Sequence, residues 1–216
     1  MSVKVAVCYI TTYGLDPRLV YQVARHEGCR LRAYPDPGSK LAQALALPVA
    51  ARPRGWQQLS GAPWTIGYGH TGPEVHDGLV WLQSQADVAL CHDLRGWCDL
   101  LARVLPWTTQ LDPARLRVLQ DMIFNLGWDN PKTPALEGLS GFRKTLDAAK
   151  RGDWQGMHDN MLWNTPADNP LAKVPTAWSR QTGSRAQELA QQALTGVQQP
   201  VGLDAQLAAA GAASAA

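Results

Sequence analysis

Residues 26–38 read His-Glu-Gly-Cys-Arg-Leu-Arg-Ala-Tyr-Pro-Asp-Pro-Gly, and residues 64–71 read Trp-Thr-Ile-Gly-Tyr-Gly-His-Thr. Residues 30–38 and 64–71 predict two extended segments of a small sheet, because prolines and glycines break them at short intervals. Long stretches with helical periodicity precede and follow them. The chain is therefore predicted to have an α+β fold that is mainly helical and contains a small antiparallel sheet.

The first of these stretches begins at the end of a predicted helix. Asp16 is suited to cap the free amides of that helix, and Pro17 is suited to its first turn. The i, i+3, i+4, i+7 spacing puts four side chains on one face, those of Val20, Val23, Ala24 and Glu27. A carboxyl on an apolar face is costly to ionise and tends to stay protonated. Gly28 is predicted to end the helix.

Hydrophobic periodicity and the turn residues between periodic segments predict further helices. These helices are expected at residues 41–47, 84–105, 112–126, 142–151, 153–163 and 176–194. We predict one domain at residues 16–195, an N-terminal extension at residues 1–15 and an Ala-rich tail at residues 196–216, which has little to bury. For the extension an edge strand, a membrane contact and no role at all stay open.

The composition is that of a globular protein of 216 residues, 45% of them hydrophobic and 18% charged. A net charge of +2 does not favour nucleic acid as a partner, because such binders usually show a concentrated basic face. Nine tryptophans agree with a sugar-binding cleft, although a single tryptophan is more often a core residue. The apolar run at the N-terminus is too short to span a bilayer, and we expect no export signal and no stable membrane insertion.

The four cysteines do not have the spacing of metal ligands. Cys91 and Cys98 are seven residues apart in one predicted helix, roughly 10 Å along its axis and beyond disulfide reach. We expect both to be reduced core thiols, which favours folding in the cytoplasm. No metal and no other cofactor is expected.

Glu27, Asp36 and Thr65 together indicate the chemistry of glycoside hydrolysis. That reaction needs a protonated acid beside the leaving oxygen and a carboxylate that handles water or the oxocarbenium charge. Glu27 suits the first role, because an apolar setting raises the pKa of a carboxyl group. Asp36 lies in a Pro-Asp-Pro-Gly turn, where water and backbone amides favour its ionised form. The Thr65 hydroxyl would hold water or orient Asp36.

Each of these residues also has an ordinary structural interpretation. A glutamate at a helix end is usually solvated or paired with a cation. An aspartate between prolines usually forms a turn, and a threonine in a strand usually reflects β propensity. The hypothesis depends on all three residues occurring in this order with these neighbours.

Two segments, residues 27–38 and 64–71, closely resemble the phage-type lysozymes of glycoside hydrolase family 24. Three later segments resemble the family's central helix, the segment after it and the C-terminal helix with its arginines, at residues 121–127, 141–146 and 178–189. The resemblance spans residues 17–195. It implies a lysozyme-like fold, in which a small antiparallel β lobe and a helical lobe flank a cleft.

The resemblance also implies that Glu27, Asp36 and Thr65 form a catalytic triad. The implied reaction is hydrolysis of the β-1,4 bond between N-acetylmuramic acid and N-acetylglucosamine in peptidoglycan, with inversion at the anomeric carbon. Glu27 would donate the proton, while Asp36 and Thr65 would position the attacking water. His70 and Asp93 are expected to form a structural pair. Substrate contacts are expected from Thr71, Phe124, Asn125 and Gly127.

The chain departs from the family pattern between Asp36 and Thr65. The family has a short hairpin at this place, whereas residues 37–64 intervene in this chain. We expect residues 39–63 to form an inserted loop beside the cleft, and Trp56 to contact substrate.

The resemblance finally implies a monomeric endolysin of a phage or prophage that acts in lysis of the host cell. Such an enzyme would wait in the host cytoplasm until a holin opened the membrane, and would then act on peptidoglycan in the periplasm. Other functions stay open: a lytic transglycosylase or a chitinase on the same core, or a non-enzymatic wall-binding or tail structural protein. A transglycosylase can work with one acid, so Asp36 and Thr65 argue against that class.

Overall fold

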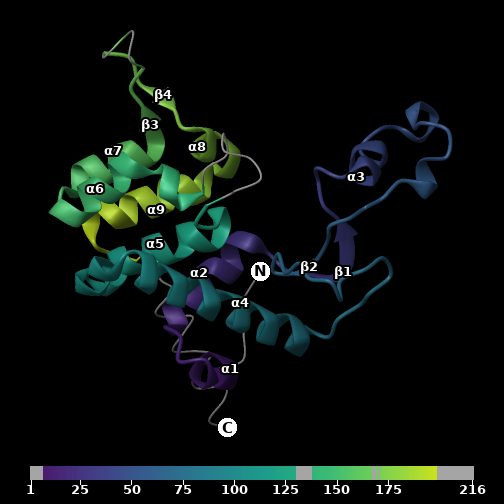
Figure 1. The fold of residues 1–216 in the computed structure, drawn as a ribbon, viewed down its shortest axis with the longest axis horizontal. Coiled ribbons are helices and arrows are strands. Elements are labelled where there is room, and N and C mark those ends of the chain that lie inside the picture. The colour runs from purple at the N-terminus through teal and green to yellow at the C-terminus, as the bar shows by residue number, and fades with distance from the viewer. Residues whose placement is uncertain (1–6, 130–137, 167–168, 170, 199–216) are drawn as a thin grey trace. The chain divides into compact units, whose positions relative to one another are not determined.

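The computed structural model describes residues 7–129, 138–166, 169 and 171–198. The chain divides into two compact units, Met1–Asp93 and Leu94–Ala216. Helix α4, Gln83–Val104, contributes residues to both units (Figure 1). The described residues are mainly helical and include a small antiparallel sheet, which confirms the predicted α+β class.

The first unit contains a pair of antiparallel strands, β1, Arg30–Pro35, and β2, Trp64–Gly67. Both strands lie where extended segments were predicted. Tyr34 on β1 is opposite Thr65 on β2. A small core lies beside the strands and consists of Ala33, Ile66 and Val75, with Trp64, Leu79 and Trp81 packed against it.

Two helices precede the strands. α2, Pro17–Glu27, begins at the predicted place, and the Asp16 side chain caps its first turn. It ends at Gly28, whose φ of 66° is a conformation that glycine adopts easily. α1, Val7–Thr12, lies in the predicted N-terminal extension and buries Ile10. The described part of the extension is therefore helical and not an edge strand.

Residues 39–63, which we call the insertion, have local structure. α3, Lys40–Leu45, corresponds to the short helix predicted at residues 41–47. Two short 3-10 turns follow, η1, Val49–Ala51, and η2, Trp56–Gln58. Figure 1 shows α3 and the turns after it projecting away from β1 and β2.

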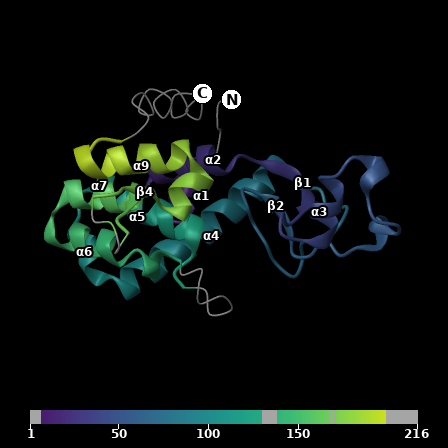
Figure 2. The ribbon, with the colours of Figure 1, turned by 90° about the horizontal axis from the view of Figure 1, so that it is seen from above.

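Among the described residues of the second unit, one short hairpin accompanies the helices. After α4 come the 3-10 turn η3 (Pro106–Gln110), α5 (Pro113–Leu126), the 3-10 turn η4 (Leu139–Gly141), α6 (Arg143–Arg151) and α7 (Trp154–Leu162). They are followed by β3 (Trp163–Asn164), β4 (Val174–Pro175), α8 (Ala177–Thr182) and α9 (Ser184–Thr195). α7 packs against both α6 and α9 (Figure 2). The core includes the fully buried side chains of Leu119, Met122, Ile123, Met157 and Met161. The β3–β4 hairpin was not predicted, since two-residue strands leave no alternation to detect.

The single helix predicted at residues 176–194 is wrong. The structure has α8 and α9 there, separated by Gly183. This glycine has a φ of 54° and a ψ of −113°, a conformation that L side chains rarely adopt and that ends the helical hydrogen bonding. Trp178 before the break and Leu189 after it are both buried, so apolar periodicity did not reveal the interruption.

All four cysteines are free thiols. Cys91 is buried and Cys98 is half-buried, while Cys8 and Cys29 are exposed. None of the helices in the described residues has the length and apolarity to cross a membrane. Of the predicted Ala-rich tail, residues 199–216 lie outside the described residues.

Candidate active site

Glu27 is the last residue of α2, and the packing of the preceding turns fixes its place. Val20, Val23 and Ala24 on the same face are buried, whereas Glu27 is half-buried. Gly28 donates its N–H to the carbonyl of Ala24 at 3.1 Å, and the chain after it is exposed. The Glu27 carboxyl therefore lies at the edge of the apolar face and not within the core.

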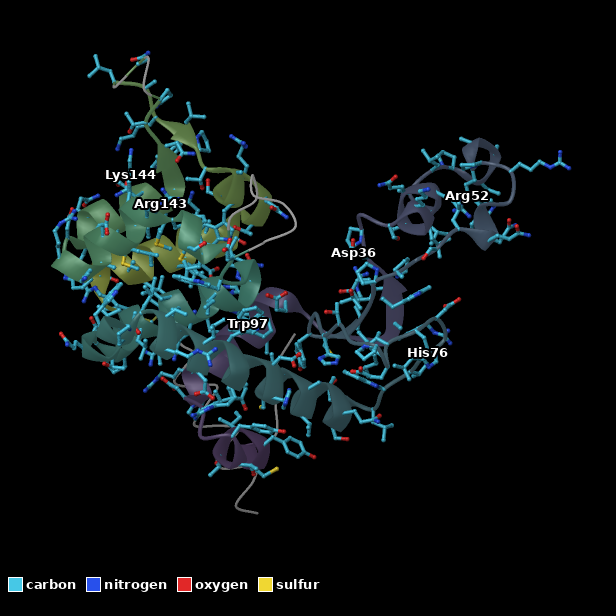
Figure 3. The ribbon with its side chains drawn as sticks, in the orientation of Figure 1. Asp36, Arg52, His76, Trp97, Arg143 and Lys144 are labelled. Atoms are coloured by element: carbon cyan, nitrogen blue, oxygen red, sulfur yellow. The ribbon has the colours of Figure 1, made fainter. Side chains whose placement is uncertain are left out.

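Asp36 lies in a tight turn where β1 ends and the insertion begins (Figure 3). Its Oδ1 accepts the N–H of Gly38 at 2.7 Å, and its backbone carbonyl accepts the N–H of Ser39 at 2.8 Å. A Cβ atom at Gly38 would lie only 3.0 Å from that Oδ1, so glycine leaves the room that the carboxylate needs. The turn thus fixes the direction of a half-buried carboxylate.

Thr65 and Asp36 lie on the same face of the β1–β2 pair. Residues opposite one another in an antiparallel pair share a face, and side chains on one strand alternate between faces. Thr65 is opposite Tyr34, and Asp36 follows Tyr34 by two positions. The pairing continues to Asp36, which donates its N–H to the carbonyl of Pro63 at 2.9 Å. Thr65 is buried on this face.

Glu27 approaches the turn that follows β2. This turn passes through Gly67 and Gly69, which have φ values of 65° and 93°, and brings His70 back to pair with Ile66. A Cβ atom on Gly69 would lie 3.7 Å from the Glu27 Oε2. The acid at the end of α2 and the strand that carries Thr65 are therefore neighbours within the first unit.

The phenol of Tyr34 interacts electrostatically with the carboxylates of Glu27 and Asp36. Burial raises the pKa of its phenol, the Arg30 guanidinium opposes this rise, and Glu27 and Asp36 both add to it. The Arg30 guanidinium carbon lies 4.5 Å from the centre of the Tyr34 ring. The sequence prediction missed Tyr34 and Arg30. The spacing of two residues between Tyr34 and Asp36 on a predicted strand was the signal that would have placed Tyr34 on the site's face.

His70 is held between two carboxylates. Its Nδ1 lies 2.6 Å from Asp93 Oδ2, and its Nε2 lies 2.7 Å from Glu74 Oε1. Burial lowers the pKa of the imidazole, but the hydrogen bonds to Glu74 and Asp93 outweigh it, and the pKa is raised. Both ring nitrogens donate when the ring is protonated, so the contacts favour an imidazolium. The structure brings the predicted pair together and adds Glu74, which sequence reasoning missed.

Trp56 lies in the insertion, and a cation covers one face of its ring. The Arg52 guanidinium carbon is 4.6 Å from the ring centre. Arg52 also donates to the carbonyl oxygens of Leu47 and Leu45, at 3.1 and 3.3 Å (Figure 3 labels Arg52). These contacts hold Arg52 in place, so at most the other face of Trp56 is available to a sugar. Thr71, the other substrate residue predicted in this unit, is exposed.

The remaining predicted substrate residues belong to the second unit, at the C-terminal end of α5. Phe124 is half-buried and Asn125 is exposed. The Asn125 side-chain oxygen accepts the indole N–H of Trp178 at 2.9 Å. Gly127 ends α5 with a φ of 72°, and the Trp97 ring would lie 3.6 Å from a Cβ placed on it. These local contacts give the end of α5 a defined conformation.

The first unit therefore combines two carboxylates, a buried threonine and a tyrosine around one strand pair. Such groups can give and take protons at a polar ligand without a metal. In the part of the chain that the structure describes, no group of three or more His, Cys, Asp or Glu side chains is arranged to hold a metal ion.

Comparison with known families adds an independent observation. The model of the family described as phage lysozyme matches residues 50–182, which is more than half of the chain. The matched range includes Thr65, whereas Glu27 and Asp36 precede it. No curated protein matches the chain. The family match confirms the predicted resemblance to phage-type lysozymes, and the chain belongs to the phage lysozyme family.

Proposed function

We propose that this protein is a muramidase that hydrolyses the β-1,4 bond between N-acetylmuramic acid and N-acetylglucosamine in peptidoglycan. The observation that carries the proposal is the grouping of Glu27, Asp36 and Thr65 around β1 and β2 in a chain of the phage lysozyme family. Two carboxylates in different settings are the requirement of glycoside hydrolysis.

In the proposed reaction, Glu27 gives its proton to the glycosidic oxygen as the bond to the anomeric carbon breaks. A water molecule attacks that carbon from the opposite side. Asp36 accepts a proton from this water, and the Thr65 hydroxyl orients it. Because Asp36 acts through water and forms no bond to the sugar, the anomeric carbon inverts. Asp36 then releases its proton to solvent and Glu27 takes one up, so both groups return to their starting states.

The same proposal gives roles to the other predicted residues. Thr71 and Trp56 in the first unit, and Phe124, Asn125 and Gly127 in the second, would contact the sugar chain. The His70–Asp93 pair would hold the turn after β2, which approaches Glu27, and would take no part in proton transfer. The protein would act as a monomeric endolysin that reaches peptidoglycan in the periplasm after a holin has opened the membrane.

The test is digestion of purified Gram-negative peptidoglycan, followed by mass spectrometry of the fragments. The wild-type protein is expected to release muropeptides that end in reducing N-acetylmuramic acid, and Glu27→Gln is expected to release none. Asp77→Asn is the control, since it makes a comparable change from carboxylate to amide at an exposed residue of the same unit. Circular dichroism of each variant checks that it is folded.

Other products would replace the proposal with a different function. Anhydromuramic ends would identify a lytic transglycosylase and remove the role of Asp36. Cleavage of chitin but not of peptidoglycan would identify a chitinase. Absence of cleavage by the folded wild-type protein would favour a wall-binding or structural protein. Proton NMR of the first product tests the stereochemistry: the α-anomer must appear first if the enzyme inverts.

A further inference from the structure

Three apolar residues that lie close together in the sequence of the insertion have exposed side chains. Leu45, Leu47 and Val49 have exposed fractions of 39%, 42% and 73%. They lie at the end of α3 and the start of η1, in the segment that projects from the strand pair (Figure 1). Large aliphatic side chains gathered on a surface usually mark a place of interaction, since each is costly to leave in water.

The charged side chains within this segment have one sign. Residues 37–73 contain no aspartate and no glutamate, but they contain Lys40, Arg52 and Arg54. Lys40 and Arg54 are exposed. The hydrogen bonds from Arg52 to the carbonyl oxygens of Leu45 and Leu47 keep its positive charge beside the apolar group.

This combination does not fit a polysaccharide well. Sugars are bound by aromatic faces and by side chains that form several hydrogen bonds. Leucine and valine side chains offer neither, and Arg52 covers one face of Trp56. Binding of a second copy of the chain through this surface would bring like charges together. An anionic bilayer surface offers phosphates for the cations and an apolar layer just beneath them for the aliphatic side chains.

We propose that residues 40–54 form a peripheral docking surface for membranes that contain anionic phospholipid. Leu47 and Val49 enter the boundary between headgroups and acyl chains, and Lys40, Arg52 and Arg54 contact lipid phosphates. Few groups take part, so the binding is weak, reversible and sensitive to salt. This surface goes beyond the proposed hydrolysis and does not depend on it.

The test is flotation of the full-length protein with vesicles, in the absence of peptidoglycan. The wild-type protein is expected to bind vesicles of phosphatidylethanolamine and phosphatidylglycerol in equal parts, and to bind vesicles of phosphatidylcholine at least about tenfold less. The double variants Leu47→Ser/Val49→Ser and Lys40→Gln/Arg54→Gln are each expected to lower binding about tenfold. High salt should also release the wild-type protein.

Leu171→Ser is the matched control, because Leu171 is 96% exposed but lies outside the insertion. It should bind as the wild-type protein does. Val49→Trp should strengthen binding, a gain that a loss of folded protein does not produce; circular dichroism monitors folding of every variant. The proposal is overturned if the wild-type protein does not bind anionic vesicles, or if the serine variant binds unchanged. It is also overturned if the serine variant digests purified peptidoglycan poorly while its vesicle binding is intact, since the surface would then contact polymer.

Discussion

At the scale of single residues, the candidate active site depends on strand register. Thr65 and Asp36 share a face only because Tyr34 is opposite Thr65. A shift of one residue would turn the Thr65 side chain to the other face of the pair. The Pro-Asp-Pro-Gly turn and the glycines after β2 limit such a shift, because each permits a backbone path that other residues would resist.

This placement predicts a specific effect of removing the Thr65 hydroxyl. Thr65→Val keeps the β-branched shape on β2 but cannot orient a water, so kcat on peptidoglycan should fall about 10²-fold while KM changes little. Thr65→Ser keeps the hydroxyl and should retain most of the activity. Steady-state kinetics and urea unfolding of both variants make the comparison. Equal losses of activity in the two variants would show that packing at Thr65, and not its hydroxyl, limits the reaction.

The His70 contacts predict a pH dependence of stability. The folded-state pKa of His70 is raised by hydrogen bonds to Glu74 and Asp93, in spite of burial. The stabilisation is therefore complete below the unfolded pKa of about 6.5 and is lost as pH rises through the folded pKa. Between pH 6 and pH 9, the wild-type protein should therefore lose unfolding free energy relative to His70→Asn. Urea unfolding at a series of pH values measures this difference.

At low pH, Glu74 gives the unfolding free energy a pH dependence of the opposite sign. The hydrogen bond to His70 lowers the pKa of Glu74, so the Glu74 contribution is present above its unfolded pKa and is lost as pH falls through its folded pKa. His76→Asn is the control, because His76 is exposed and its Nδ1 lies 2.9 Å from the backbone oxygen of Asp77 (Figure 3 labels His76). A His76 variant with the same pH profile as the His70 variant would contradict the assignment.

At the scale of elements, local signals predicted most helix boundaries. Asp112 caps α5 at the start of the range predicted for this helix, with its side chain accepting the N–H of Arg115 at 3.1 Å, and Gly127 ends the helix. Such signals act within one turn and need no tertiary contact. The conformation of Gly183 gave no comparable signal, because glycine is compatible with a helix as well as with a break.

In the candidate active site, too, local sequence motifs predicted some residues, whereas others could be recognised only from tertiary contacts. Glu27, Asp36 and Thr65 were predicted because they lie in recognisable local motifs. The surroundings of Tyr34 depend on its pairing with Thr65 of the other strand and on Glu27, which comes from α2. Glu74 follows His70 by four residues but is not in a helix, so the contact arises from the path of the loop between β2 and α4.

Two glycines offer a matched test of the break between α8 and α9. A Cβ at Gly96 in α4 or at Gly183 would have no atom within 4 Å, so only the backbone distinguishes the two sites. Gly96→Ala should raise the unfolding free energy by about 0.5–1 kcal/mol, since alanine favours a helix. Gly183→Ala should lower it by about 1 kcal/mol or more, since its φ of 54° suits glycine. Urea unfolding of both variants shows whether each substitution raises or lowers the unfolding free energy. A stabilising Gly183→Ala would mean that α8 and α9 are one helix in solution.

At the scale of the whole molecule, α4 is the element that the two units share. Cys91 lies on the part of α4 that belongs to the first unit, and Cys98 on the part that belongs to the second. Burial raises the pKa of each thiol to about 12. Since the thiolate is the reactive form, both should be inert in the folded protein at pH 8, whereas the exposed Cys8 should react.

These two thiols can therefore report whether the units unfold together. We expect pulse labelling in increasing urea, read by mass spectrometry of the peptides, to modify Cys91 and Cys98 over the same range of denaturant. A helix of this kind is stabilised mainly by tertiary packing, so loss of one unit would leave the adjoining half of α4 with an unsupported apolar face. Cys8 provides the internal control, because its thiol is exposed and its labelling should be complete without urea. If Cys91 and Cys98 were labelled with different urea midpoints, the part of α4 in one unit could unfold while the other unit stays folded.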